Sequence, residues 1–151
     1  MQIRNYKDDD WAALATFKVT DAQTEFVEPI IETLRTTSLT RDNFVMEKNG
    51  RIIGFFQIDS TSNSQCIANH LELHEVFIDH SQQGKGYGQE FILALAPFLK
   101  GKYPKSSGVC LTVNCRNTKA IRLYEFGGFV DTGDLRTEGK AGPQFILRKV
   151  I

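Results

Sequence analysis

The chain has 151 residues, of which 41% are hydrophobic and 24% are charged, and its 18 basic and 18 acidic residues give a formal net charge of zero. This length suits a single domain over residues 1–151, and the balanced charge supplies no overall field that would attract nucleic acid or an anionic membrane. The sequence has no apolar signal segment at its start, no run as long as a membrane span, and no CxxC pair among its three cysteines. We therefore expect a cytoplasmic protein that binds neither nucleic acid nor membrane, and three histidines are too few to predict a metal site.

In chain order, the first half predicts a strand, two helices and a β-hairpin. Apolar residues at helical spacing predict the helices, and two β-rich runs on either side of Asn49-Gly50 predict the hairpin. Pro29 must lie in the first turn of the second helix or kink it. The predicted elements are a strand at residues 1–6, helices at 8–19 and 24–37, and paired strands within 43–59.

The second half predicts a strand, a helix, a strand, a helix and a final pair of strands. These elements fall at residues 71–79, 88–100, 108–114, 118–126, 129–136 and 143–151. The second of these helices ends at two glycines, which commonly stop a helix. The whole order predicts a mixed α/β domain whose only strong β-α-β unit lies in the middle of the chain.

A glycine-rich loop joins the strand and the helix of that unit. Gly84, Gly86 and Gly88 leave backbone amides uncovered directly before a helix, whose first amides have no partner within the helix. Amides and the positive end of a helix dipole together bind anions, phosphate above all. A turn that only links the strand to the helix is the alternative interpretation.

Two common nucleotide loops do not fit this spacing. A dinucleotide fingerprint starting at Gly84 would need glycine where Gln89 stands, and a P-loop would need glycine where Asp79 stands. The remaining pattern, Gln83-x-x-Gly86-x-Gly88 after a strand, resembles the acetyl-coenzyme A loop of the GNAT superfamily of N-acetyltransferases.

A second segment supports the same resemblance. About thirty residues further on, "VNCRNTKAIRLYEFGGF" is similar to the second signature of that family, and the matching segments cover roughly Leu71 to Val130. The resemblance implies a GNAT fold: a central, mostly antiparallel mixed sheet of six to seven strands, splayed between the fourth and fifth strands and flanked by about four helices. It also implies acetyl-CoA as co-substrate, no metal, and a homodimer.

The resemblance assigns a coenzyme site along the strand, the loop and the second signature. Loop amides would hold the pyrophosphate, with Gln83 bracing the loop, and the strand backbone would hold the pantetheine arm. Lys85 is equally well explained as a solvated lysine, and Asn117 as the N-cap of its helix. The residues so assigned are Val76, Phe77, Ile78, Gln83, Gly84, Lys85, Gly86, Tyr87, Gly88, Gln89, Asn117 and Tyr124.

Two residues are predicted to be catalytic. Tyr124 lies seven residues after Asn117, two helical turns on, and its hydroxyl can protonate or hydrogen-bond the departing thiolate of the coenzyme. A core tyrosine with a satisfied hydroxyl is the alternative. Glu75 is the expected base for the amine, directly or through water, with Glu72 and His74 on the same strand as rivals.

The sequence determines the identity of the acyl acceptor less well than that of the acyl donor. Glu28, Glu32, Glu72 and Glu75 would form an acidic mouth for a cationic amine, although a solvated helix face explains the first two equally well. The segment "FKVTDAQTEFVEP" is similar to bacterial spermine/spermidine acetyltransferases of the superfamily, so we expect a polyamine or a similar small primary amine. Protein N-termini, lysines and aminoglycosides remain open as acceptors. A non-catalytic coenzyme-binding module and a nucleotide-binding regulator are the rival classes.

Overall fold

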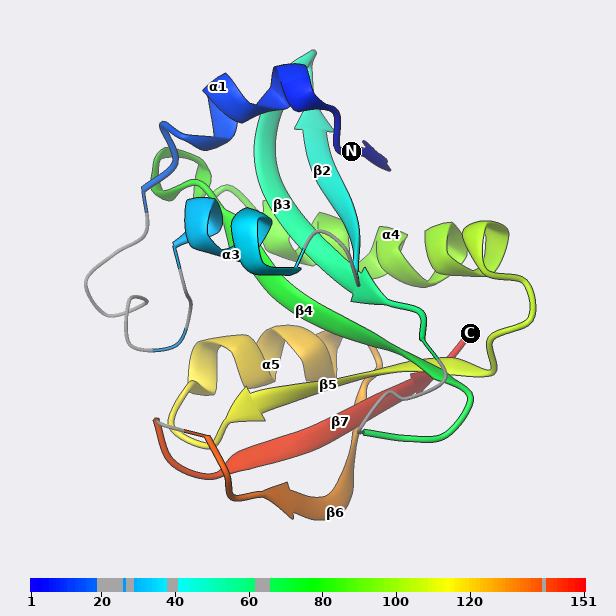
Figure 1. The fold of residues 1–151 in the computed structure, drawn as a ribbon. Helices are drawn as coiled ribbons and strands as arrows, with labels where there is room; N and C mark the ends of the chain where they lie inside the picture. Colours follow the sequence, from blue (N-terminus) through cyan, green and yellow to red (C-terminus); the bar gives the residue numbers. More distant parts are fainter. Residues whose placement is uncertain (19–25, 27–28, 38–40, 62–65, 140) are drawn as a thin grey trace.

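A seven-stranded sheet forms the centre of the molecule, in the order β1-β2-β3-β4-β5-β7-β6 (Figure 1). The computed structural model describes residues 1–18, 26, 29–37, 41–61, 66–139 and 141–151. The strands are β1 (Gln2–Asn5), β2 (Asp42–Lys48), β3 (Arg51–Asp59), β4 (His70–Ile78), β5 (Gly108–Asn114), β6 (Val130–Arg136) and β7 (Gln144–Val150). All neighbours are antiparallel except β4 and β5, which confirms the predicted mixed, mostly antiparallel sheet.

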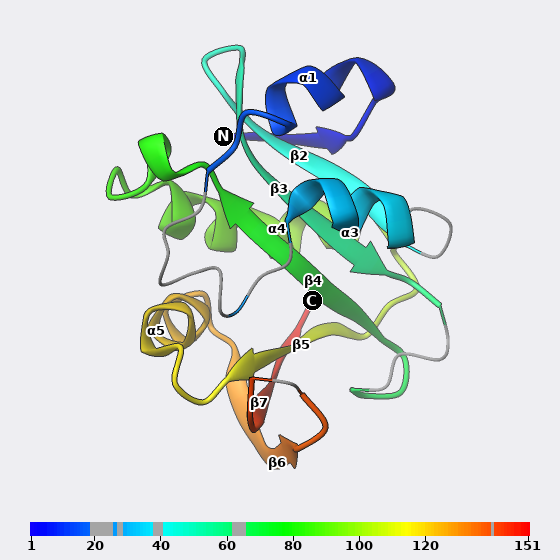
Figure 2. The same cartoon turned by 60° about the vertical axis from the view of Figure 1, so that its left-hand side comes forward.

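Helices cover both faces of this sheet (Figures 1 and 2). They are α1 (Trp11–Leu14), α3 (Ile30–Thr37), α4 (Tyr87–Lys102) and α5 (Thr118–Phe126), with single 3-10 turns at η1 (Asp8–Asp10) and η2 (His80–Gln82). One apolar core packs α4 and α5 against the sheet, and a smaller one packs α1 and α3 on the opposite face. The sheet therefore separates two layers, and the site lies where the sheet itself opens.

The first helix is shorter than its sequence predicts. We expected it over residues 8–19, but α1 ends at Leu14. The hydroxyl of Thr16 donates to the carbonyl of Ala13 at 2.7 Å, a local bond that competes with helix continuation. In the second helix, α3 begins at Ile30 directly after Pro29, as the fixed φ of proline favours at a helix start, while residues 24–25 and 27–28 of the prediction lie outside the described residues.

The sheet opens between β4 and β5. The two strands pair only at His70–Gly108, Leu71–Val109 and Glu72–Cys110. Beyond that point β5 continues in register with β7, while β4 continues with β3. This divergence confirms the predicted splay, and it leaves one edge of β4 without a strand partner from Leu73 to Ile78 among the described residues.

Candidate active site

The glycine loop adopts the backbone that an anion cradle needs. Gly84 and Gly86 have φ values of 75° and 80°, in the left-handed region that side chains other than glycine rarely adopt. An added Cβ at either residue would meet nothing within 4 Å, so the space beside the loop is open to a ligand. Gly86 is the N-cap residue of α4, and no side chain caps the helix within the described part of the chain. Its first amides are therefore available to an anion.

Two neighbouring side chains hold the loop in place. Nε2 of Gln83 donates to the carbonyl of Ile78 at 2.9 Å, which ties the loop to the end of β4 and agrees with the bracing role expected of Gln83. Nζ of Lys85 donates to Oε1 of Gln82 at 3.1 Å on the exposed side of the loop. Lys85 is thus a solvated loop lysine in this state, although its charge stays near the anion cradle.

Gly88 serves packing rather than backbone freedom. An added Cβ would lie 3.4 Å from the side chain of Leu123 on α5 and 3.8 Å from that of Ile78 on β4. The absence of a side chain lets the start of α4 approach both elements closely. The loop, the end of β4 and the middle of α5 consequently meet at one point.

A β-bulge interrupts β4 inside the splay. Glu75 has a φ of 47°, and two residues, Glu75 and Val76, stand opposite Phe56 of β3. Val76 packs into the core under α4 and α5, whereas Phe77 packs into the core under α1 and α3. The bulge re-aims the strand at the point where it loses its second partner, as bulges near active sites commonly do.

Tyr124 and Glu75 come together across the splay. Tyr124 lies on α5, and its ring packs edge-on against Phe129 with 5.7 Å between ring centroids. Burial, and then the negative charge of Glu75, raise the pKa of the Tyr124 hydroxyl above its usual value of 10. The phenol therefore stays protonated at neutral pH and can donate a hydrogen bond to an anion, while Glu75 remains close enough for its charge to be felt.

The two asparagines near α5 have structural partners. Oδ1 of Asn117 accepts from the amide of Ala120 at 3.2 Å, which confirms its N-cap role. Asn114, the last residue of β5, is 5% exposed; its side chain donates to the carbonyl of Ala141 and accepts from the amide of Arg116. Asn117 is half-buried at the start of α5, and its contact with the coenzyme stays a prediction.

A second charged cluster lies on the opposite face of β4. Glu72, 4% exposed, accepts a hydrogen bond from Sγ of Cys66 at 3.4 Å, and its Oε1 lies 3.5 Å from Nε2 of His74 and 3.9 Å from a guanidinium nitrogen of Arg136. Burial alone would raise the pKa of Glu72, but His74, Cys66 and Arg136 outweigh it and lower the pKa to about 2. A carboxylate so weakly basic is a poor proton acceptor at neutral pH, so these surroundings disfavour Glu72 as the base, and the choice among the three candidates stays a prediction.

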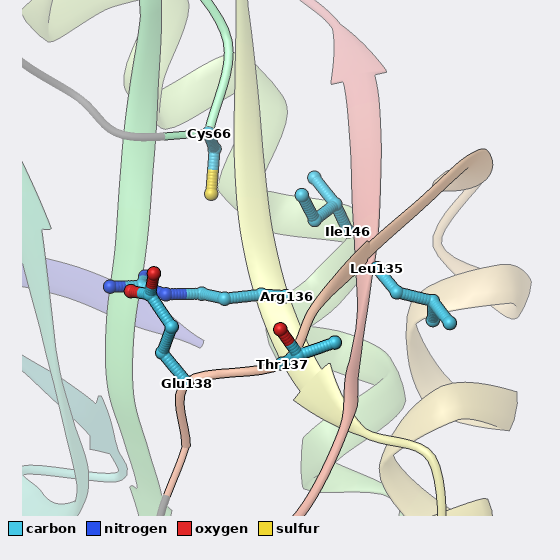
Figure 3. Close-up of a pocket in the computed structure, with 6 residues that line it drawn as sticks. All are labelled: Cys66, Leu135, Arg136, Thr137, Glu138 and Ile146. Atoms are coloured by element: carbon cyan, nitrogen blue, oxygen red, sulfur yellow. The ribbon is translucent and has the colours of Figure 1, made fainter.

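This cluster borders a shallow pocket on the same face. The pocket has a volume of about 250 Å³ and is lined by Cys66, Leu135, Arg136, Thr137, Glu138 and Ile146 (Figure 3). The alternation in "LELHE" already placed Glu72 and His74 on one face, but nothing in the sequence indicated that Cys66 and Arg136 would join them. Those partners come from a loop and from β6, and only the fold brings them to β4.

Two predicted acceptor residues remain, Glu28 and Glu32. Glu32 lies exposed on α3, and Glu28 lies outside the described residues.

Among the residues that the structure describes, no three His, Cys, Asp or Glu side chains are placed to hold a metal ion. None of the described helices combines the length and the apolar character that crossing a membrane requires.

Comparison with known proteins agrees with this geometry. Residues 6–129 match the family model described as the acetyltransferase (GNAT) family. An uncharacterized N-acetyltransferase of Bacillus subtilis is 28% identical over 152 residues, which cover 97% of this chain and 94% of that protein.

Solved structures agree in fold. The spermidine N-acetyltransferase from Vibrio cholerae, in complex with CoA and spermine, superposes with a TM-score of 0.74 at 21% identity, over 99% of this chain and 94% of that one. An aminoglycoside acetyltransferase in complex with coenzyme A and kanamycin gives 0.77 at 21% identity, over 98% and 93%. With the glycine loop, the splay and the family match together, the chain belongs to the GNAT family and is an acetyl-CoA-dependent N-acetyltransferase.

Proposed function

We propose that the protein transfers the acetyl group of acetyl-CoA directly to a primary amine of a small cationic acceptor, with a polyamine as the first candidate. The observation that carries the proposal is the meeting of the open glycine loop, the unpaired edge of β4 and the Tyr124 hydroxyl in one splay. Amides of Gly84 to Gln89 bind the pyrophosphate, and the backbone of Val76 to Ile78 binds the pantetheine arm. The thioester then lies near the bulge.

The chemistry needs two proton movements. The amine nitrogen bonds to the acetyl carbon while the carbon–sulfur bond breaks, and the amine loses a proton. Tyr124 meets the departing thiolate with its hydroxyl. A thiol has a pKa of about 8.5, whereas the pKa of the Tyr124 hydroxyl is raised above 10. Tyr124 therefore stabilises the thiolate by donating a hydrogen bond rather than by transferring its proton. Glu75 and His74 border the same point of β4 and compete for the proton that the amine loses.

Acidic side chains support a cationic acceptor. Glu75 stands at the bulge, Glu138 lines the pocket beside β4, and Glu32 is exposed on α3. The Vibrio cholerae enzyme of the same fold is a spermidine acetyltransferase bound to spermine, which supports trying polyamines first. The aminoglycoside enzyme has an equally similar fold, so kanamycin belongs in the same test.

An amine panel with acetyl-CoA tests the proposal. We would follow release of coenzyme thiol with spermidine, spermine, kanamycin, a lysine-bearing peptide and a peptide with a free N-terminus, using Gly86→Asp protein as the matched blank. The expected result is turnover that is fastest with a polyamine. Coenzyme binding without turnover on any amine would make the protein a non-catalytic binding module. Stabilisation by ATP or NAD but not by coenzyme A would contradict the coenzyme site itself.

A further inference from the structure

We propose that His74, oriented by Glu72, is the group that takes the proton from the attacking amine, an inference that rests on the acetyl transfer proposed above. The two side chains occupy the same face of β4, two residues apart, directly before the bulge at Glu75. Oε1 of Glu72 lies 3.5 Å from Nε2 of His74. This is the arrangement of a carboxylate–imidazole pair on a rigid strand.

The carboxylate of Glu72 is suited to orient the imidazole and not to take a proton itself. It is buried, it accepts from the thiol of Cys66, and it faces the guanidinium of Arg136. With a pKa of about 2 it remains ionised at any pH at which the enzyme works. An ionised carboxylate beside Nε2 favours the tautomer that carries its proton on Nε2, which leaves the lone pair of Nδ1 to accept the proton of an amine.

Nε2 of His74 fits this role because it is buried without a satisfied hydrogen bond in the described part of the chain. A buried polar nitrogen in that state costs free energy; Nε2 of His70 is in the same state, and what distinguishes His74 is the carboxylate of Glu72 at 3.5 Å. A modest movement of the ring closes the 3.5 Å gap to Glu72 when the imidazole becomes charged. The position of Glu72 thus stabilises the protonated imidazolium of His74 more than it stabilises the neutral imidazole.

The position of His74 also favours it over Glu75. Helices α4 and α5 cover the face of the splay on which Tyr124 lies, and the charge of Glu75 reaches the Tyr124 hydroxyl on that side. The pocket beside Arg136 opens on the opposite face, where Glu72 and His74 stand. The pocket and the Glu72–His74 pair thus share one face of β4, whereas the charge of Glu75 acts on the side of Tyr124.

The surroundings of His74 come from several elements. Gln57 of β3 stands opposite His74, and a guanidinium nitrogen of Arg41 donates to Oε1 of Gln57. Apart from Glu75 beyond the bulge, the titratable and charged groups around the pair include Asp59, which stands opposite Glu72 on β3, and also Cys66, Cys110, Arg136 and, through Gln57, Arg41. The contact with Cys110, and then burial, keep the pKa of the Cys66 thiol above its usual value, so that thiol does not compete as a base.

The step balances without a further reactant. The amine nitrogen forms its bond to the acetyl carbon, and the electrons of the carbon–sulfur bond leave with sulfur as the thiolate. Nδ1 of His74 takes one proton from the nitrogen and becomes an imidazolium held by Glu72. The imidazolium releases that proton to solvent, the thiolate is protonated from solvent, and amide and free coenzyme leave.

The test compares matched substitutions on one strand. His74→Gln should lower kcat/KM by about 100-fold or more, remove the rise of rate with pH on the acid side, and leave coenzyme A affinity unchanged. His74→Asn serves the same purpose if the glutamine protein does not fold. His70→Gln, the same change at the paired end of β4, should keep the wild-type rate and pH profile. Added imidazole should restore turnover to His74→Ala, which a purely structural role would not allow.

Glu72→Gln separates orientation from proton transfer. It should lower kcat by about tenfold while the KM for the amine and the coenzyme A affinity stay the same, since the imidazolium loses its carboxylate partner. A wild-type pH profile in His74→Gln together with loss of turnover in Glu75→Gln would overturn the inference and assign the base to Glu75. That outcome leaves the acetyl transfer itself intact, whereas failure of the wild-type protein on every amine removes the proposed function.

Discussion

The coenzyme side and the acceptor side of β4 are built from different parts of the chain. On the coenzyme side, the groups that matter are backbone amides: a loop with two left-handed glycines, an uncapped helix start and an unpaired strand edge. On the acceptor side, they are charged side chains from β4, β6 and a loop, gathered around the buried carboxylate of Glu72. Binding on the coenzyme side depends on backbone conformation, and the arrangement on the acceptor side depends on side-chain charge.

This difference decides what each side tolerates. A backbone site accepts many side chains provided that the chain keeps its turn, so its requirements reduce to a few glycines at fixed spacing. A cluster of buried charges fails when any one member is lost, because the remaining partners are left uncompensated. Substitutions on the two sides should therefore fail in different ways, in binding on one and in stability or turnover on the other.

Gly86→Asp should have the largest effect, and chiefly on coenzyme binding. The left-handed φ of 80° costs a non-glycine residue about 1–2 kcal/mol. The new carboxylate also repels the pyrophosphate, so coenzyme A affinity should fall at least about a hundredfold. Titration calorimetry measures the affinity, and Gly86→Ala is the control, since it adds the strain without the charge. Equal affinities for wild type and Gly86→Asp would remove the loop from the coenzyme site.

Glu72→Gln should show its effect as pH-dependent stability on the acceptor side. Because folding lowers the pKa of Glu72 from 4.5 to about 2, its ionised form stabilises the fold by about 3 kcal/mol at neutral pH. This contribution is complete above pH 4.5 and is lost as the pH falls through about 2.

Urea unfolding of wild type and Glu72→Gln at pH 7 and pH 3 measures the contribution. The difference in unfolding free energy should shrink from about 3 to about 1 kcal/mol. A difference that does not change with pH would mean that the carboxylate is not the stabilising group. Glu125→Gln, an exposed glutamate on α5, is the matched control and should change neither value.

The coenzyme side could be predicted from the sequence because its requirements are local. Glycine spacing, the strand before it and the helix after it all lie within about thirty residues, and α5 was predicted with the bounds that it has. The splay and the mixed sheet followed from the family resemblance. The acceptor cluster could not be predicted, because Cys66 and Arg136 are 70 positions apart and meet Glu72 only after the sheet has formed.

Tyr124→Phe should slow turnover by roughly 10- to 100-fold, the value of a hydrogen bond to a charged group. Coenzyme affinity should stay the same, and so should the packing against Phe129, which needs only the ring. Since the pKa of Tyr124 lies above 10, the hydroxyl keeps its proton throughout the working range. The ratio of wild-type to variant rates should therefore be constant from about pH 7 to 9.

Two results would contradict this role. Wild-type turnover in Tyr124→Phe would leave the tyrosine as a packing residue of the core beneath α5. A ratio that falls as the pH rises toward 9 would mean that the phenol ionises in that range, against the direction set by its burial and by Glu75.

Asn117→Ala should have the smallest effect and tests whether the coenzyme side includes this side chain. Loss of the cap to the Ala120 amide should cost about 1 kcal/mol of unfolding free energy. Asn117→Asp is the matched variant, because it keeps a capping oxygen and adds a negative charge. If Asn117 also contacts the coenzyme, affinity should fall in both variants, whereas stability should fall only in the alanine protein. If coenzyme A affinity is unchanged in both variants, the side chain of Asn117 is not part of the coenzyme site. Asn117 then contributes only by fixing the start of α5, the helix that positions Tyr124.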